Sequence, residues 1–310
     1  MSLTNYQSGH LDVSEHTSVF WEAHGNPNGK PVLLIHGGSG HTFDLEKIDA
    51  FDPNEYFIVT WHQRGEGNSA LDDPENAPLF SNVHDAEKLR EHLEIDQWHI
   101  FSWSFGAIYM TAYGCLHPER CLSFTSHAPF LGDVEDWDVM FDDDPARAQA
   151  FLDHYQASGI SEAKREAFKR AVQLPKEAQI SDLYKKAVIF GYDGTEQDFR
   201  QSKTDDEWDI ELKRVRMREK LYDETMNQLG SRWLFQLSHE NTEFKSIPTT
   251  LLFGDNDQWV APNPNTWFVY PYATQQMIEG VGHDVHDPGV QSVLRFVVEG
   301  HRQIGFDKAM

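Results

Sequence analysis

The stretch Ile100-Phe101-Ser102-Trp103-Ser104-Phe105-Gly106-Ala107 decides the fold of this chain. Its pattern predicts a buried strand that turns sharply into a helix, with Ser104 at the apex of the turn. Ser102 and Gly106 are small, as this pattern requires, because bulky side chains there would collide with the neighbouring strand. A serine on such a strained turn is a candidate nucleophile, provided that the chain also supplies a base, an acid and an oxyanion hole.

Hydrophobic strands followed by glycine-rich loops precede this stretch. Residues Val32-Leu33-Leu34-Ile35 are apolar on both faces, as a central parallel strand must be, and lead into His36-Gly37-Gly38-Ser39-Gly40. A second predicted strand, Tyr56–Trp61, leads into the glycine-rich loop 62–69, and a helical pattern follows. This alternation predicts an α/β fold with a mostly parallel sheet flanked by helices. Sites in such sheets form beyond the carboxyl ends of the strands, so both loops and Ser104 are expected at one edge.

The glycine-rich loop 36–40 could serve two purposes. Gly-Lys-Ser/Thr is absent from it, which disfavours a phosphate-binding loop. We therefore predict an oxyanion loop, in which the backbone N–H groups of Gly38 and Phe105 point at a developing negative charge. His36 is predicted to be structural, and Arg64 in the second loop is expected to form a local ion pair.

The alternation of strands and helices stops after Pro129. Between residues 132 and 245 the sequence shows an acidic segment followed by helical patterns, and no strand is predicted there. A helical insertion between two strands of an α/β sheet is placed to cover the site at the strand ends. We therefore predict a core formed by residues 1–131 and 246–310 and a helical cap insertion formed by residues 132–245.

Two predicted strands beyond this insertion, Thr249–Phe253 and Gln276–Ile278, complete the sheet. The first leads through a glycine into Asp255 and Asp257, and the second leads into His283. Asp257 is preferred to Asp255 as the catalytic acid, because the third residue after the strand-ending glycine reaches past the sheet edge. Asp255 is predicted to form the turn.

His283 is preferred to His286 as the catalytic base, because Gly282 precedes it at the strand exit. The resulting order Ser…Asp…His is the one found in α/β-hydrolases. A serine hydroxyl needs an adjacent base, so His283 would take the proton of Ser104 while Asp257 orients the imidazole. We predict these residues to be a catalytic triad, and the chemistry requires no cofactor and no metal.

The amino-acid composition limits which binding partners and which cellular compartment we expect for this protein. The 310 residues include 50 acidic and 26 basic side chains, and the formal net charge of −24 would repel nucleic acid and anionic membranes. The two cysteines, Cys115 and Cys121, favour a reducing compartment over a disulfide framework. Residues 1–11 lack the pattern of a secretion signal, and no apolar run approaches the roughly 20 residues of a membrane span. We expect a cytoplasmic protein that acts on a small molecule or a short peptide.

Short motifs spread over the whole predicted core add to this pattern. They are Trp21-Glu22, Gly25-Asn26-Pro27, Gly29-Lys30-Pro31, His36-Gly37-Gly38-Ser39-Gly40, Phe51-Asp52-Pro53, Gln63-Arg64-Gly65, Leu89-Arg90-Glu91-His92-Leu93, His117-Pro118-Glu119-Arg120 and Gly282-His283. Through them the chain resembles the proline iminopeptidases (prolyl aminopeptidases) of the α/β-hydrolase superfamily. The resemblance implies an eight-stranded type of sheet, an inserted cap, the same triad, and release of a small N-terminal residue, usually proline, through an acyl-enzyme.

The chain also departs from the motifs of that family. Ser39 replaces a proline, His62 replaces an aspartate, and the elbow is Ser-Trp-Ser-Phe-Gly instead of Gly-Gly-Ser-Trp-Gly. The cap lacks the family's Trp-x-x-Trp-Glu and Glu-Asn-His-Tyr-Phe stretches, and the family uses cap glutamates to hold the free amine of the substrate. Two alternatives therefore stay open: a hydrolase of an ester, lactone or small amide, and a non-hydrolytic ligand-binding protein on the same scaffold.

Overall fold

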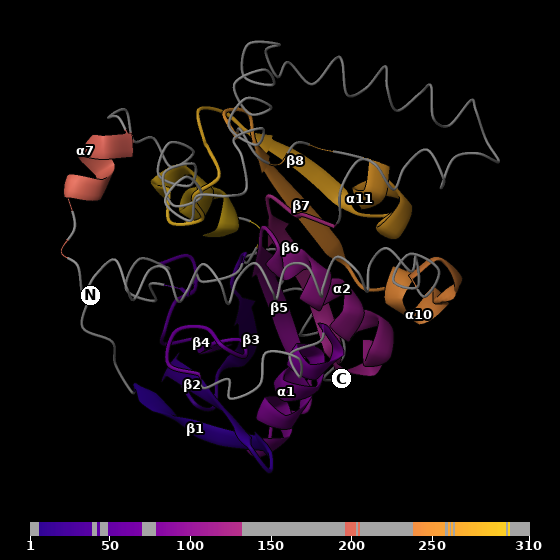
Figure 1. The fold of residues 1–310 in the computed structure, drawn as a ribbon. Helices are drawn as coiled ribbons and strands as arrows, with labels where there is room; N and C mark the ends of the chain where they lie inside the picture. The colour runs from indigo at the N-terminus through magenta and orange to yellow at the C-terminus, as the bar shows by residue number, and fades with distance from the viewer. Residues whose placement is uncertain are drawn as a thin grey trace.

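The computed structural model describes residues 6–38, 42–43, 49–69, 79–131, 196–202, 204, 238–257, 260, 262, 264–295 and 297. Within these ranges the chain forms an eight-stranded sheet with helices packed against it (Figure 1). No helix in this part of the chain is both long and apolar enough to cross a lipid bilayer. The predicted α/β fold is confirmed.

The sheet is mostly parallel, as predicted. Its strands are β1 (Gln7–Ser14), β2 (Thr17–Gly25), β3 (Lys30–Ile35), β4 (Tyr56–Trp61), β5 (Trp98–Trp103), β6 (Cys121–His127), β7 (Thr249–Gly254) and β8 (Thr274–Ile278). They lie in the order β1-β2-β4-β3-β5-β6-β7-β8. β2 pairs antiparallel with both β1 and β4, and all the other neighbours are parallel. The chain moves from β3 to β4 on one side and then to β5 on the other, and such a switch point is where sites form in parallel sheets.

Hydrophobic side chains cover both faces of the sheet, which is why the central strands are continuously apolar. On β3, Leu33 and Ile35 belong to one core, while Val32 and Leu34 belong to the other. The first core is completed by α1 (Leu79–His92), α2 (Gly106–Leu116), α10 (Thr242–Lys245) and the end of α11 (Pro264–Val269). The second core receives Val290 and Leu294 from the helical residues 288–295.

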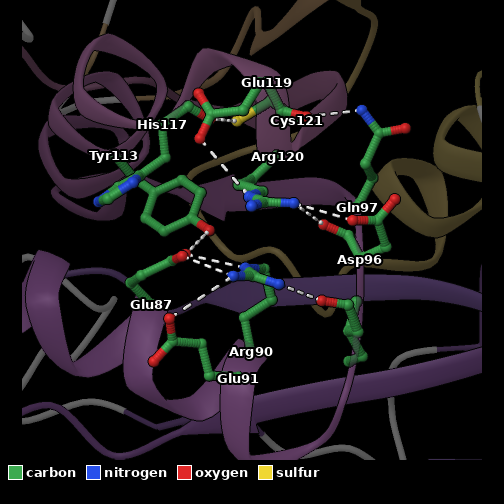
Figure 2. Close-up of polar contacts among 11 residues, drawn as sticks. Glu87, Arg90, Glu91, Asp96, Gln97, Tyr113, His117, Glu119, Arg120 and Cys121 are labelled. Atoms are coloured by element: carbon green, nitrogen blue, oxygen red, sulfur yellow. Dashed lines mark hydrogen bonds and ion pairs between the residues drawn. The ribbon is translucent and has the colours of Figure 1, made fainter.

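A polar cluster ties α1 to α2 beside the first core (Figure 2). Glu87 on α1 accepts hydrogen bonds from the Tyr113 hydroxyl on α2, at 2.6 Å, and from the Arg90 guanidinium, at 2.6 and 2.9 Å. Arg90 also donates to the carbonyl oxygen of Ile95, in the connection that leads to β5. Burial raises the pKa of Glu87, but the hydrogen bonds from Arg90 and Tyr113 outweigh it and hold that pKa below its usual value. This cluster gives a structural role to Arg90 in one of the family motifs.

The predicted cap, residues 132–245, lies mostly outside the described residues. Within it the structure describes α7 (Glu196–Gln201) and the helical residues that lead to β7. The last of these helices, α10, packs on the core: Asn241 at its N-cap donates to the carbonyl oxygen of Cys115 at 2.9 Å, and Phe244 is buried beside Phe124. The domain boundaries stay predictions.

Candidate active site

Ser104 lies between β5 and α2 with a φ of 52°, in the left-handed region that side chains other than glycine rarely adopt. Two backbone hydrogen bonds to the residues at the exit of β6 hold it there. The Ser104 N–H donates to the His127 carbonyl at 2.9 Å, and the Ser104 carbonyl accepts from the Phe130 N–H at 3.1 Å. The strained turn predicted from the sequence is therefore present, and it is stabilised by the neighbouring strand.

Gly106 explains why the turn needs a small residue two positions after the serine. A Cβ atom on Gly106 would lie 2.5 Å from the carbonyl oxygen of Ile35 and 2.7 Å from that of His36. Both oxygens belong to the end of β3 and the loop that follows it. The start of α2 therefore packs directly against the backbone that carries the glycine-rich loop.

The structure brings Ser104, His283 and Asp257 together. His283 Nε2 lies 2.9 Å from Ser104 Oγ, and His283 Nδ1 lies 2.8 Å from Asp257 Oδ2. With Nδ1 protonated toward the carboxylate, Nε2 is free of its own proton and can accept the serine hydroxyl proton. The arrangement is chemically able to generate a serine nucleophile.

Asp257 lies just beyond the end of β7. Its carboxylate is buried, and Oδ1 accepts a hydrogen bond from the Val260 N–H at 3.1 Å, leaving Oδ2 for His283. Asp255 lies in the turn after β7, and its Oδ1 accepts from the Gly280 N–H in the turn after β8 at 2.7 Å. The alternative histidine, His286, contacts Asp284 at 2.9 Å. The geometry thus separates each predicted triad residue from its nearest competitor.

The two predicted oxyanion donors lie next to each other. A Cβ atom on Gly38 would contact the Phe105 Cβ at 3.8 Å, so the loop after β3 passes directly beside the residue that follows Ser104. Phe105 is also the N-cap of α2, where the partial positive charge of a helix N-terminus favours an anion. An oxyanion formed at Ser104 would develop close to both backbone positions, whose role as donors remains a prediction.

His36 joins the two glycine-rich loops. Its Nε2 accepts from the Gln63 N–H at 3.2 Å, its Nδ1 donates to the Gly37 carbonyl at 3.0 Å, and its own carbonyl accepts from the Gln63 side chain at 3.1 Å. Glu66 lies 3.6 Å from the same Nδ1. The structural role predicted for His36 is confirmed, and that role is to fix the loop that carries Gly38.

The second glycine-rich loop is anchored by contacts of Arg64 and His62. Arg64 forms a bidentate pair with the buried Asp85, at 2.6 and 2.7 Å, which confirms the predicted local ion pair. His62 lies 3.3 Å from Glu22 on β2, and this contact holds the pKa of Glu22 below its usual value. His62, one of the departures from the family motifs, thus has a partner of its own.

His127 is a buried histidine beside the triad that the sequence did not identify. Burial and, to a smaller extent, the nearby His283 lower its pKa to about 4, although Asp257 and Asp284 oppose the shift. In the folded protein His127 is therefore neutral at physiological pH. No signal in the sequence distinguishes this residue from the other histidines, because its environment is created by β5, β7 and the His283 loop together.

Metal ligation has no support in the described ranges, where no group of three or more His, Cys, Asp or Glu side chains could hold an ion.

Known proteins with similar sequences carry one recurring name. A probable proline iminopeptidase of Leptolyngbya boryana is 41% identical over 135 residues, which are 42% of this chain and 41% of that protein. The proline iminopeptidase of Arabidopsis thaliana is 39% identical over 127 residues, covering 41% of this chain and 33% of its own. The chain thus matches less than half of the length of these relatives. A longer match joins it to the proline iminopeptidase of Xylella fastidiosa strain 9a5c, 28% identical over 302 residues, 92% of this chain and 93% of that protein.

Solved structures confirm the fold at low sequence identity. A putative lipase from Acinetobacter baumannii superposes with a TM-score of 0.65 at 16% identity, over 97% of this chain and 93% of its own. The haloalkane dehalogenase DbeA from Bradyrhizobium elkani gives 0.64 at 12% identity, over 98% and 100%. The sequence itself matches the alpha/beta hydrolase fold family over residues 30–290. With its sheet order and its serine turn between β5 and α2, the chain belongs to the alpha/beta hydrolase fold family.

Proposed function

We propose that this protein is a serine hydrolase in which Ser104, His283 and Asp257 form the catalytic triad. One observation carries the proposal: a continuous hydrogen-bonded chain runs from Ser104 Oγ to His283 Nε2 at 2.9 Å and from His283 Nδ1 to Asp257 Oδ2 at 2.8 Å. The strained φ of Ser104 supports it, because strain of this kind concentrates at functional residues.

In the first half of the reaction Ser104 Oγ attacks the carbonyl carbon of the substrate. His283 Nε2 takes the hydroxyl proton, and Asp257 stabilises the imidazolium that results. The carbonyl oxygen becomes an oxyanion, which accepts hydrogen bonds from the backbone N–H groups of Gly38 and Phe105. Collapse of the tetrahedral intermediate breaks the bond to the leaving group, and His283 delivers its proton to that group. An acyl-enzyme on Ser104 remains.

In the second half a water molecule replaces the leaving group. His283 takes a proton from the water as its oxygen attacks the acyl carbon, and the same two N–H groups stabilise the second oxyanion. The ester bond to Ser104 then breaks, and His283 returns the proton to Ser104 Oγ. The acid product leaves, and the triad is restored.

We propose further that the substrate carries a small N-terminal residue such as proline, so that the enzyme is an aminopeptidase of the proline iminopeptidase type. The support is the recurring name of the relatives, among which the Xylella fastidiosa protein matches 92% of this chain. A carboxylate would have to bind the free amine, and we assign that task to the proposed cap, residues 132–245. The acidic composition and the two buried free cysteines support a cytoplasmic site of action on a small molecule or short peptide.

Hydrolysis of an uncharged ester, lactone or small amide is the second candidate. The observation that favours it is the departure of the elbow, Ser-Trp-Ser-Phe-Gly, from the family's Gly-Gly-Ser-Trp-Gly, together with the missing cap motifs. These differences leave the proposed triad intact while removing the family motifs to which the resemblance assigns recognition of the free amine. A ligand-binding protein without turnover is the third candidate.

Paired chromogenic substrates test the proposal. The wild type and Ser104→Ala are compared on a prolyl or alanyl anilide with a free amine, on the same anilide with its amine acylated, and on a short uncharged ester. We expect cleavage of the free-amine anilide alone, and we expect Ser104→Ala to lower kcat by about 10⁴-fold or more, because the nucleophile is lost.

Cleavage of the ester alone, again through Ser104, would keep the serine hydrolase and replace the aminopeptidase. Equal cleavage of both anilides would also overturn the aminopeptidase, since the free amine would then play no part. A wild type that turns over none of the three substrates and whose Ser104 resists a small fluorophosphonate would overturn the triad itself and leave the binding protein.

A further inference from the structure

Trp103, the residue before Ser104, links three parts of the proposed active site. They are the turn at Ser104, the loop after β8 that carries His283, and the loop after β3 that carries Gly38. Its indole Nε1–H donates a 2.7 Å hydrogen bond to the backbone carbonyl of His283, 180 positions further along the chain. The side chain is only 5% exposed. In the sequence a tryptophan at this position is simply a hydrophobic residue of the core, and nothing in the pattern indicates the polar contact.

The same ring also supports the loop that carries the predicted oxyanion donor. A Cβ atom on Gly37 would lie 3.0 Å from the Trp103 carbonyl oxygen and 3.2 Å from its Cδ2, so the loop after β3 lies against both the backbone and the ring. The indole centroid is 5.8 Å from that of the His283 imidazole and 6.0 Å from that of His286. Trp103 is thus the chain neighbour of Ser104. It donates a hydrogen bond to the loop that carries His283, and it packs against the loop that carries Gly38.

We propose that Trp103 is a positioning residue. Its indole N–H holds the His283 loop at the distance from Ser104 that the hydrogen bond between the two side chains requires. The loop after β8 is joined to the turn after β7 by the Asn256 N–H, which donates to the Val281 carbonyl at 2.9 Å, and β5 is buried along its whole length. A hydrogen bond from β5 to the His283 carbonyl therefore transmits the position of the sheet to the base. Since a small displacement of a catalytic group is costly, its loss should slow proton transfer from Ser104. The inference rests on the proposed serine hydrolase function.

The test is the rate at which a small fluorophosphonate labels Ser104. This reaction uses Ser104, His283 and the oxyanion donors, and it requires no knowledge of the natural substrate. We expect Trp103→Phe, which keeps an aromatic ring and removes the N–H, to label about 10-fold more slowly than the wild type, the value of one lost hydrogen bond. On any substrate that the wild type turns over, kcat should fall by a similar factor while KM changes little.

Trp98→Phe is the matched control. Trp98 lies on the same strand, is equally buried and packs against Tyr113 on the other face of the sheet, away from Ser104. It should lose a comparable part of the free energy of unfolding and keep the wild-type labelling rate. Replacement of Trp103 by benzothienylalanine, which keeps the bicyclic shape and removes only the N–H donor, covers the case in which Trp103→Phe does not fold.

The outcomes separate this inference from the function on which it rests. Slow labelling of both Trp103 variants with a normal rate for Trp98→Phe supports it. A wild-type rate in either folded Trp103 variant, or equal slowing in Trp98→Phe, would overturn the positioning role while leaving the serine hydrolase in place. A wild type that is never labelled at Ser104 would instead refute the function.

Discussion

The Ser104 backbone stores strain that its neighbours must balance. A φ of 52° places a non-glycine residue in the left-handed region, at a cost of roughly 1–3 kcal/mol. Two hydrogen bonds at the exit of β6 offset this cost, one donated by the Ser104 N–H to the His127 carbonyl and one donated by the Phe130 N–H to the Ser104 carbonyl, and they use backbone groups alone. The side chain is therefore left to face His283. Because the backbone holds the turn in place while the side chain faces His283, the turn can be strained without losing its position.

His127 gives the same region a dependence on pH. Its folded-state pKa of about 4 lies below the value of about 6.5 expected in an unfolded chain, because burial disfavours the imidazolium. Below the unfolded value, the unfolded chain binds a proton that the folded protein excludes. The stability that His127 contributes is thus present above about pH 6.5 and is lost as the pH falls through about 4.

We predict that His127→Asn makes the protein less sensitive to acid. Asparagine does not titrate, so the loss of unfolding free energy between about pH 7 and pH 5 should be about 2 kcal/mol smaller in the variant than in the wild type. Urea unfolding curves of both proteins at the two pH values measure this difference. The other titrating groups are common to the two proteins, so the difference reports His127 together with its electrostatic coupling to His283 and Asp257. Parallel pH dependences would show that His127 is already protonated in the folded state or is not buried.

At the scale of strands and helices, the sequence was sufficient to predict those elements whose pattern is local, that is, contained within the element itself. Continuous apolar runs located β3, β4 and β5, and the glycine-rich loops located their carboxyl ends, because both patterns are local. Ser104, Asp257 and His283 could then be selected as candidates, because each follows the end of a predicted strand. The Trp103–His283 hydrogen bond and the burial of His127 could not be predicted, because each depends on how β5, β6 and the loop after β8 meet in space.

At the junction between β3 and α2, the close approach of the two elements leaves no room for a side chain at Gly106. A second prediction follows from this contact. Gly106→Ala should lower the free energy of unfolding by about 3 kcal/mol or more, because the new Cβ would meet two backbone oxygens that cannot move without displacing β3. Gly282→Ala is the control: the nearest atom to its Cβ would be the Asn256 carbonyl oxygen at 4.0 Å, so its cost should stay within about 1 kcal/mol. Urea unfolding measures both. Equal costs in the two variants would mean that the β3–α2 approach is looser than described.

The whole molecule carries a formal net charge of −24, and this charge acts on every element at once. The ion pairs described here, such as Arg64 with Asp85, neutralise a few carboxylates locally, whereas 50 acidic residues against 26 basic ones leave a large excess. Mutual repulsion among these groups opposes the compact state, because folding brings them closer together. Composition alone predicts this property, since it depends on the number of charges rather than on their exact positions.

We therefore predict that salt stabilises the folded protein. The Debye length falls from about 30 Å at 0.01 M to about 8 Å at 0.15 M ionic strength, so most of the repulsion should be screened within this interval. The urea midpoint should rise steeply with sodium chloride up to about 0.15 M and then level off. Urea is required because guanidinium is itself a salt, and sucrose at matched osmolality controls for solvent effects that do not depend on charge. A midpoint that stays constant or falls with sodium chloride would mean that attractive ion pairs, which salt also screens, outweigh the net repulsion despite the charge excess.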